Sequence, residues 1–363
     1  MNKKNTKKIP KEAKPVELAK NGKFDNINWS KLSVADITEF DDKGFTLLHY
    51  AIRQGHWESL PVKLRDKKFW QDAKDGTSIY LSACYGNDLD RIDTSQLTTE
   101  DLLKRNKKGD FLALHYTNKA RLYTIPKDII TEEVLWQKVE DGYRATGGYP
   151  QDYLIHRIAR FDQIGYVHEE HLSHELLALK SNSGQTVFHL LADDEANRIP
   201  QELWRREALL YQDDSKVTPL HLITRCSGDL IPNTITINDL ITPDDQGNTP
   251  LYNWCLAPGT RWTLIPNKYL TKESLESTGG DLRQTVLEKL LNRYKKEYPC
   301  PNREDLNTLM SSKISYALKQ IETAKLKELL KNYDPPVTKL IKEEILKRKA
   351  KKELARQEEP LEI

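Results

Sequence analysis

Cysteine is scarce in this sequence, and its few copies form no recognisable pattern. The four cysteines among 363 residues are separated by 142, 29 and 45 positions. Zinc sites use closely paired cysteines, and small disulfide-bonded domains are much richer in them. We therefore expect buried or incidental thiols at Cys84, Cys226, Cys255 and Cys300.

Long apolar runs are absent as well. The hydrophobic fraction is 38%, and no segment approaches the roughly 20 apolar residues that span a bilayer as a helix. The first residues, Met-Asn-Lys-Lys-Asn, are not followed by the apolar stretch of a secretory signal. We expect a cytoplasmic protein that does not enter the membrane.

The motifs of common catalytic sites are missing too. There is no Gly-x-Ser-x-Gly, His-Glu-x-x-His, phosphate-loop or dinucleotide pattern, and the glycine-rich segment 144–150 lacks a following Lys-Ser/Thr. His168, His171 and His174 have a spacing that can bring imidazoles together on a helix. However, His174 belongs to a repeated segment whose other copies contain no histidine. We expect no catalytic residue, no metal and no cofactor.

What the sequence does contain is a repeat. The segment Gly-Phe-Thr-Leu-Leu-His-Tyr-Ala-Ile at residues 44–52 returns in related form at residues 184–192, 216–224 and 247–255. We call the site of its histidine the histidine position; successive copies are 31 to 36 residues apart, with one interval of 41. The copies are His49, Leu81, His115, His156, His189, His221, Tyr252 and Glu288. A period near 33 residues predicts about eight small helical units stacked in an array.

Two further landmarks recur in each unit. An apolar residue followed by proline comes first, and a Leu-Thr-x-Glu type of segment comes second. The first occurs at Leu60-Pro61, Ile125-Pro126, Ile199-Pro200, Ile231-Pro232 and Ile265-Pro266, and the second at residues 97–100, 130–133, 172–175 and 270–273. Proline suits the first turn of a helix, and Thr or Ser caps a helical turn. Each repeat is therefore predicted to contain, in order, a turn, a helix, a loop, a second helix and a short helical turn.

These residues resemble the ankyrin repeats. The match is in Gly-x-Thr-Pro-Leu-His-x-Ala, best at residues 44–51, 184–191 and 218–223, and it covers about residues 40 to 290. It implies an all-α protein, an α-solenoid of about eight ankyrin-like helix-turn-helix repeats with a C-terminal helical cap. It also implies that the histidine is a scaffold residue near the turn. The second half of each unit departs from the family, with Ile-Pro and Leu-Thr-x-Glu.

The resemblance further implies where a protein partner would bind. Ankyrin repeats usually hold partners with the turns, called fingers, and the adjoining first helices. The matching positions here are Asp42, Lys43, Phe45, Arg53, Gln54, Ser183, Gln185, Ser215, Val217, Gln246 and Asn248. Phe45 is the most informative, because an aromatic residue at a turn tip is typical of interfaces, although it can instead pack on a neighbouring finger. Asp213 and Asp244 are interpreted as turn formers or solvated charges.

The 41-residue interval indicates an insertion, and insertions in repeat arrays emerge as loops on one face. We expect Tyr143, Arg144 and Tyr149 to form a contact loop.

Charge is distributed unevenly along the chain. Residues 1–23 carry +6, residues 337–357 carry +5 and residues 358–363 carry −3, so the remaining part carries −6. We expect a disordered basic tail over 1–23, a repeat array over 24–298, a helical extension over 299–357 and an acidic tail over 358–363. In the extension, Asn302 begins a helix whose apolar stripe runs from Leu306 to Ala324, and a second helix follows residues 334–336.

The pattern favours a non-enzymatic protein–protein interaction scaffold or inhibitor that works as a monomer. The alternative is a nucleic-acid-associated protein that uses its basic N- and C-terminal segments to contact phosphates. Residues 337–357 contain no aromatic residue, which weakens that alternative. An enzyme built in the C-terminal helices has no group of residues behind it.

Overall fold

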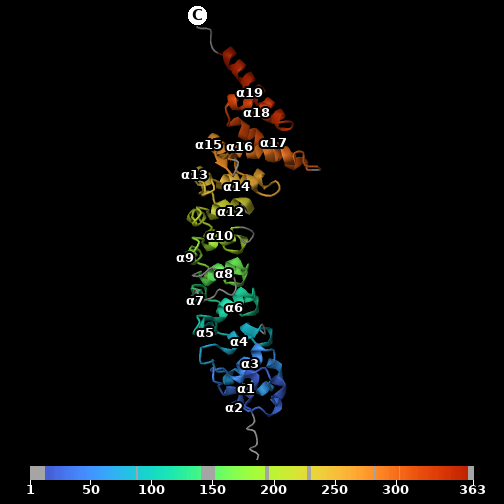
Figure 1. The fold of residues 1–363 in the computed structure, drawn as a ribbon. Helices are drawn as coiled ribbons and strands as arrows, with labels where there is room; N and C mark the ends of the chain where they lie inside the picture. Colours follow the sequence, from blue (N-terminus) through green and yellow to red (C-terminus); the bar gives the residue numbers. More distant parts are fainter. Residues whose placement is uncertain are drawn as a thin grey trace, which may run out of the picture. The chain divides into compact units, whose positions relative to one another are not determined.

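The computed structural model describes residues 13–86, 89–139, 152–192, 196–226, 230–280, 283–301 and 303–358 (Figure 1). The described residues are mostly helical, which confirms the predicted all-α class. The chain forms two compact units, Met1–Leu172 and Ser173–Ile363. None of the helices in the described ranges is both long and apolar enough to cross a bilayer.

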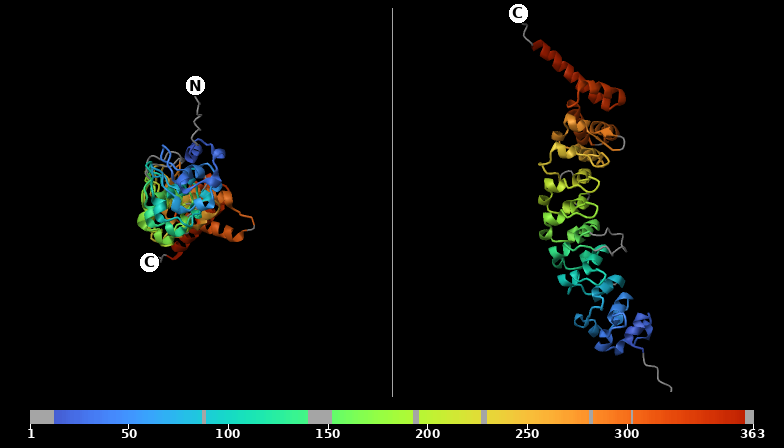
Figure 2. Two further views of the ribbon diagram at one scale, coloured as in Figure 1. Left: turned by 90° about the horizontal axis from the view of Figure 1, so that it is seen from below. Right: turned by 60° about the vertical axis from the view of Figure 1, so that its left-hand side comes forward.

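In the first unit, one helix carries each histidine position. These helices are α3 (Leu47–Arg53), α4 (Ile79–Gly86), α6 (Leu112–Asn118) and α8 (Leu154–Arg160). Each contacts the next, so they form successive layers within this unit (Figure 2). Their buried residues include Leu47, Leu48, Leu112 and Leu114, which place the core along the helix stack.

The second unit repeats this arrangement. The helices that carry the remaining histidine positions are α10 (Val187–Leu191), α12 (Pro219–Cys226), α14 (Pro250–Leu256) and α16 (Val286–Glu297). Contacts again link α10 to α12, α12 to α14 and α14 to α16. The periodicity of the sequence therefore located a helix for every predicted unit.

The Ile-Pro landmarks differ from expectation. At four of the five sites, proline precedes a single 3-10 turn instead of opening a second α-helix; the turns are η4 (Val62–Leu64), η8 (Lys127–Ile129), η13 (Gln201–Leu203) and η16 (Asn267–Tyr269). Pro232 is followed by a hydrogen-bonded turn. Pro61 has φ −54° and ψ 134°, an extended conformation that lies outside the helix. Further 3-10 turns lie just upstream, at η3 (Trp57–Ser59), η6 (Leu89–Arg91), η7 (Leu122–Thr124), η10 (Ile164–Tyr166), η12 (Ala196–Arg198) and η15 (Arg261–Leu264).

The third landmark forms short α-helices, as predicted. They are α5 (Thr99–Leu103), α7 (Glu132–Leu135), α9 (His174–Leu177) and α15 (Lys272–Glu276), and α11 (Arg206–Leu209) and α13 (Ile237–Ile241) lie at corresponding places. Thr98 Oγ1 accepts a hydrogen bond from Asp101 N at 3.2 Å, and Ser173 Oγ accepts one from Leu176 N at 3.2 Å. These side chains satisfy N–H groups that the first turn of a helix leaves unpaired.

The N-terminal segment is more ordered than the sequence predicted. Helix α1 (Pro15–Lys20) lies inside the expected tail, and η1 (Phe24–Asn26), η2 (Trp29–Lys31) and α2 (Val34–Thr38) follow it. Val16 and Ala19 are buried, and α1 contacts α3. The first repeat of a stack leaves its outer apolar face without a neighbour. Helix α1 covers that face, which explains why it is ordered. The tail prediction is therefore wrong for residues 15–20, and residues 1–12 lie outside the described residues.

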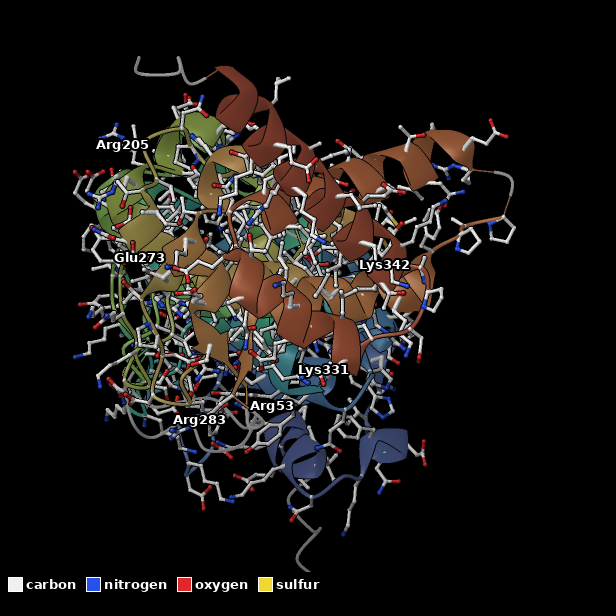
Figure 3. All side chains as sticks on the ribbon, turned by 90° about the horizontal axis from the view of Figure 1, so that it is seen from above. Arg53, Arg205, Glu273, Arg283, Lys331 and Lys342 are labelled. Carbon is white, nitrogen blue, oxygen red and sulfur yellow. The ribbon has the colours of Figure 1, made fainter. Side chains whose placement is uncertain are left out.

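The C-terminal part begins with a hairpin that leads into α16, and three further helices follow. Strand β1 (Thr278–Gly279) pairs antiparallel with β2 (Gln284–Thr285), with Thr278 opposite Thr285. The helices are α17 (Glu304–Lys319), α18 (Thr323–Asn332) and α19 (Val337–Glu358). Lys331 and Lys342 are exposed on the last two (Figure 3).

One predicted helix is divided in two. The stripe from Leu306 to Ala324 is interrupted between α17 and α18, and Ala324 is exposed. The cause is Arg348 of α19, which donates to the carbonyl oxygens of Leu318 at 3.0 Å and Ile321 at 2.7 Å. It thereby satisfies carbonyl groups that a helix end leaves unpaired. Arg303 precedes α17 as its N-cap, and the predicted cap Asn302 lies outside the described residues.

Helix α17 packs on the end of the repeat segment. It contacts α16, η15 and η16. The buried Lys313 donates from Nζ to the carbonyl oxygen of Ile265 at 2.5 Å and to Asn267 Oδ1 at 2.8 Å. These bonds fix α17 against the loop that follows α14.

Candidate partner-binding site

The histidine position joins the start of one helix to the next repeat. Nδ1 of His49 accepts a hydrogen bond from Thr46 N at 3.2 Å and lies 2.8 Å from Thr46 Oγ1. Because Nδ1 is an acceptor, the proton is on Nε2, which lies 3.0 Å from the carbonyl oxygen of Thr77. His189 and His221 make the same pair of contacts in the second unit, to Val217 O and Asn248 O at 3.1 Å each.

Other residue types at this position keep the capping role. Thr285 N donates to Glu288 Oε2 at 2.9 Å while Glu288 N donates to Thr285 Oγ1 at 3.1 Å, a reciprocal capping box. Thr249 Oγ1 accepts from Tyr252 N at 3.1 Å. The side chain at this position can thus cap the start of the helix, and a carboxylate does so as well as an imidazole.

Burial keeps these imidazoles uncharged. It lowers the pKa of His49 and of His115 to about 4, and it lowers the pKa of His189 and His221 below the usual value. At neutral pH they are neutral hydrogen-bonding groups inside the stack. The geometry supports a structural role for them.

Several of the described fingers are held by an acceptor side chain at their start. Asp41 Oδ1 accepts from Lys43 N at 3.0 Å and from Phe45 N at 2.8 Å. Asp213 accepts from two backbone N–H groups at 2.9 Å each, and Asp244 does so at 2.9 and 2.8 Å. The interpretation of Asp213 and Asp244 as turn formers is confirmed.

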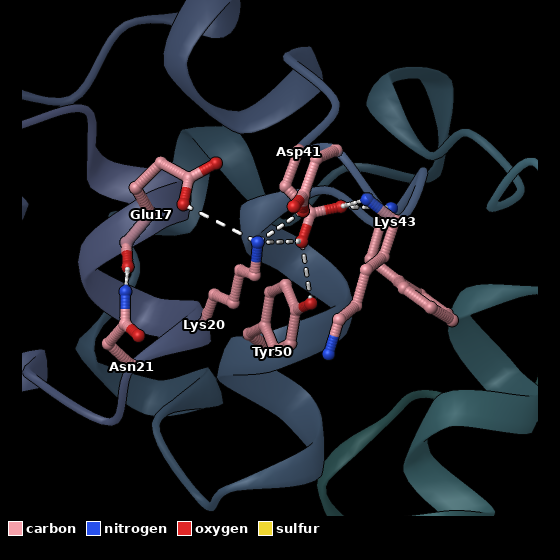
Figure 4. Close-up of polar contacts among 8 residues, drawn as sticks. Glu17, Lys20, Asn21, Asp41, Lys43 and Tyr50 are labelled. Carbon is pink, nitrogen blue, oxygen red and sulfur yellow. Dashed lines mark hydrogen bonds and ion pairs between the residues drawn. The ribbon is translucent and has the colours of Figure 1, made fainter.

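The first finger is also tied to α1 (Figure 4). Lys20 Nζ lies 4.0 Å from Asp41 Oδ2 and 3.7 Å from Glu17 Oε2, and it donates to Asp42. Asp42, one of the predicted partner-binding residues, is therefore exposed but already paired. Lys43 is exposed as well.

The remaining predicted residues separate into distinct groups. In the second unit, Asn248 Oδ1 accepts from Gly280 N at 2.8 Å and so anchors the hairpin. Ser183 and Gln185 are half-buried, and Ser183 Oγ lies 3.1 Å from Ser181 Oγ. Gln246 is exposed and lines an open cavity of about 650 Å³ that extends to the β1–β2 hairpin.

In the first unit, Gln54 is exposed at the end of α3. Tyr143, Arg144 and Tyr149 lie outside the described residues.

Phe45 and Arg53 are the predicted residues that the structure brings together. The Arg53 guanidinium carbon lies 4.5 Å from the centre of the Phe45 ring and 5.2 Å from the centre of the Tyr85 ring. Its Nε is buried and has no hydrogen-bond partner among the described residues. Burial lowers the pKa of Arg53. The guanidinium is thus held by two aromatic rings, and no carboxylate of the described residues forms an ion pair with it.

A cavity of about 280 Å³ opens at this guanidinium. Besides Phe45, Arg53 and Tyr85, it is lined by Asp75, Thr77, Asn106, Lys108 and Asp110. Tyr85 Oη donates to Asp110 Oδ2 at 2.6 Å and accepts from Asn106 Nδ2 at 3.0 Å, which fixes the ring. A planar guanidinium with free donors is suited to bind a carboxylate through two parallel hydrogen bonds.

Sequence analysis missed Tyr85, Asn106 and Asp110. Tyr85 lies four residues after the histidine position of the second repeat, as Arg53 does in the first. If the Arg53 prediction had been applied to the equivalent position of the second repeat, it would have identified Tyr85. Asn106 begins the third finger, as Asp41 begins the first.

The histidine cluster does not converge on a site. His168 Nε2 lies 2.8 Å from Asp128 Oδ1, and His174 Nε2 lies 3.2 Å from Tyr211 Oη. Within the described ranges, no three His, Cys, Asp or Glu side chains are grouped so that they could hold a metal ion.

The cysteines lie in two kinds of environment. Cys84 and Cys255 are buried, and burial raises the pKa of each thiol to about 12. Cys226 and Cys300 are half-buried. Thiols with raised pKa are poor nucleophiles at neutral pH, so the two buried ones act as apolar core groups.

Comparison with known proteins gives no family assignment: no protein-family model matches the chain, and no curated protein matches it.

Proposed function

We propose that the protein is a divergent ankyrin-like α-solenoid of about eight repeats that acts by binding another protein, as a scaffold or an inhibitor, and is not an enzyme. The observation that carries this proposal is the Arg53 guanidinium, placed between Phe45 and Tyr85 with no ion-pair partner among the described residues. The capped helices that contact one another in each unit support the repeat architecture.

A partly buried guanidinium is costly when no anion is paired with it, and neither Asp75 nor Asp110, which line the same cavity, forms an ion pair with Arg53. The cavity beside Arg53, about 280 Å³, is at the lower edge of the roughly 300–1,000 Å³ typical of small-molecule pockets. It therefore suits one acidic side chain of a partner protein. Arginine and aromatic residues also dominate the energetic centres of protein interfaces.

Affinity capture tests this function. The full chain would be immobilised as wild type and as Arg53→Ala, exposed to extract with and without nuclease, and the retained proteins identified by mass spectrometry. Arg205→Ala is the matched control, because Arg205 is an exposed arginine of the second unit that bonds only weakly to a nearby carbonyl (Figure 3). We expect a nuclease-resistant partner whose affinity falls about 30-fold on Arg53→Ala, or about 2 kcal/mol. Equal retention by all three forms would contradict this assignment.

The nucleic-acid alternative retains one supporting observation. Lys347, Lys349, Lys351 and Lys352 are all exposed on α19. Arg348 belongs to another group, since it bonds Glu344 at 2.8 Å and caps α17. A helical segment with several solvated lysines can contact phosphates without reading sequence.

A further inference from the structure

The junction between the first and second repeats departs from its sister units at three places. The first is Val62, the residue after Leu60-Pro61. Every other repeat with this landmark has a polar residue there, at Lys127, Gln201, Asn233 and Asn267. Val62 is 77% exposed, so a solvated position carries an apolar side chain in this unit alone.

The second departure is Tyr80, which directly precedes the histidine position of the second repeat. The other seven units have a side chain without polar atoms there, at Leu48, Leu114, Ile155, Phe188, Leu220, Leu251 and Leu287. Tyr80 is only 2% exposed, and its Oη has no hydrogen-bond partner among the described residues. Buried hydroxyl groups are nearly always hydrogen-bonded, so an unpartnered one in this position calls for an explanation.

The third departure is the segment 66–70, where six other repeats form a short α-helix, preceded by Thr or Ser except at α11, which follows Arg205. Here Asp66 caps a single 3-10 turn, η5 (Lys67–Phe69), and Trp70 follows it. The Trp70 ring contacts Trp57 and Tyr80 edge to face, with ring centres 5.8 and 5.0 Å apart. Its Nε1 donates to the carbonyl oxygen of Arg65 at 3.0 Å, which fixes the indole.

All three departures line one cavity of about 420 Å³, with an apolar wall made by Trp57, Val62, Trp70, Tyr80 and Ile92. It is separate from the cavity at Arg53. Tyr80 and Tyr85 lie five positions apart on α4, hence about 140° apart around the helix axis. A unit that served only to continue the stack would have no reason to differ at three places that meet in space.

Cations outnumber carboxylates in the lining of this cavity, with Arg65, Lys67 and Arg91 against Asp66 and Asp93. Lys67 is paired with Asp101 at 2.8 Å, and Asp66 is paired with Lys68 at 3.0 Å. Arg65 is held by two carbonyl oxygens, donating from Nε to Leu60 O at 2.9 Å and from Nη2 to Glu58 O at 2.7 Å. Among the described residues it forms no ion pair. Its charge is therefore oriented by neutral acceptors and adds to the positive excess of the lining.

We propose that this cavity is a second binding site, which takes a peptide segment of a protein partner with a large aromatic side chain next to an acidic residue. The aromatic ring fills the space between Trp57, Trp70 and Val62, and its polar edge hydrogen-bonds to Tyr80 Oη. The neighbouring carboxylate pairs with Arg65. A volume of about 420 Å³ is within the range of pockets that enclose a single ligand group.

A peptide selection tests the site with the full chain. A phage library of random 12-residue peptides is selected on the wild-type protein after counter-selection on Val62→Lys, which installs the residue found at the same place in the third repeat. Because Val62 is exposed and Lys127 occupies its position there, this variant is expected to fold, and its melting temperature checks that. We expect the enriched peptides to share Trp or Tyr beside Asp or Glu.

An enriched peptide is then synthesised with a fluorescent label and titrated against full-length variants. We expect Val62→Lys to weaken binding at least tenfold, Tyr80→Phe to weaken it several-fold, and Arg65→Gln to weaken it and reduce its salt dependence. Arg53→Ala is the control and leaves the affinity unchanged. The proposal is overturned if no peptide survives counter-selection, if the survivors lack an acidic or aromatic residue, or if binding depends on Arg53 instead of Val62. Those outcomes leave the separate Arg53 site untouched.

Discussion

His49 Nε2 lies 3.0 Å from the carbonyl oxygen of Thr77, so one imidazole both begins a helix and fastens it to the next repeat. The same side chain accepts the N–H of Thr46 through Nδ1. A residue with two ring nitrogens of opposite hydrogen-bonding character is needed for this double contact. Where Glu288 takes the position, the cap is kept by a carboxylate.

Replacing such a histidine should destabilise the array. We expect His189→Ala and His221→Ala each to lower the free energy of unfolding by about 1–3 kcal/mol, because a buried carbonyl and a helix N–H lose their partners. Urea denaturation measures this, with His171→Ala as the control. His171 is half-buried and lies outside the repeated position, so a change within about 0.5 kcal/mol is expected there. Equal effects of all three substitutions would count against the role of the position.

The same residues should make the protein sensitive to mild acid. The pKa of His49 and of His115 is about 4 in the folded chain, while an unfolded histidine has a pKa near 6.5. Between these values the unfolded chain binds more protons, so stability is full above about pH 6.5 and is lost as pH falls toward 4. Thermal melts from pH 7.5 to 4.5 should show a decline over this window, smaller in His49→Gln.

Carboxylates act in a different pH window and serve as the comparison. Hydrogen bonds from Ser33 and Arg206 hold the pKa of Asp36 and of Asp239 below the usual value. Their contribution to stability is lost only as pH falls below about 4. A melting temperature that stays constant from pH 7 to 5 and drops only below 4 would show that the histidines contribute nothing.

Arg348 should contribute far more to the free energy of unfolding than its charged neighbours do. Its guanidinium bonds carbonyl oxygens at the junction of α17 and α18, so Arg348→Ala is expected to cost about 2–3 kcal/mol in unfolding free energy. Lys347→Ala, one position away and exposed, should change it by less than about 0.5 kcal/mol. Hydrogen exchange of residues 315–325 should rise in the first variant. Unchanged exchange there would show that another contact holds the break.

The basic ends should bind nucleic acid weakly at physiological salt. One short basic segment of α19 holds Lys347, Lys349, Lys351 and Lys352, and the central part of the chain carries −6. That charge repels phosphates within the screening length of about 8 Å. Fluorescence anisotropy with single-stranded and duplex DNA and RNA measures the binding at several salt concentrations.

The decisive variant changes these four lysines to glutamine and keeps Arg348. Tight binding that falls steeply with salt and is lost in this variant would promote the nucleic-acid alternative to first place. Removal of residues 1–12 tests the other basic end without touching α1, whose Val16 and Ala19 are buried.

The sequence by itself determined the repeat period, the eight histidine positions with their helices, and the caps at Thr98, Ser173 and Thr271. The helix starts and caps depend on hydrogen bonds between residues within four positions of each other, so local pattern is enough to specify them, and the period is readable because the same local pattern recurs. The break before α19 was also readable, because Pro335 and Pro336 remove backbone donors.

Only the tertiary structure decided where distant groups meet. The break between α17 and α18 depends on Arg348, 27 residues beyond Ile321, and the ordering of α1 depends on burial of Val16 against the first repeat. The cavity at Arg53 gathers side chains from three successive repeats. Residues that far apart in the chain are brought together by packing, and packing selects partners by shape and burial that a periodic sequence does not specify.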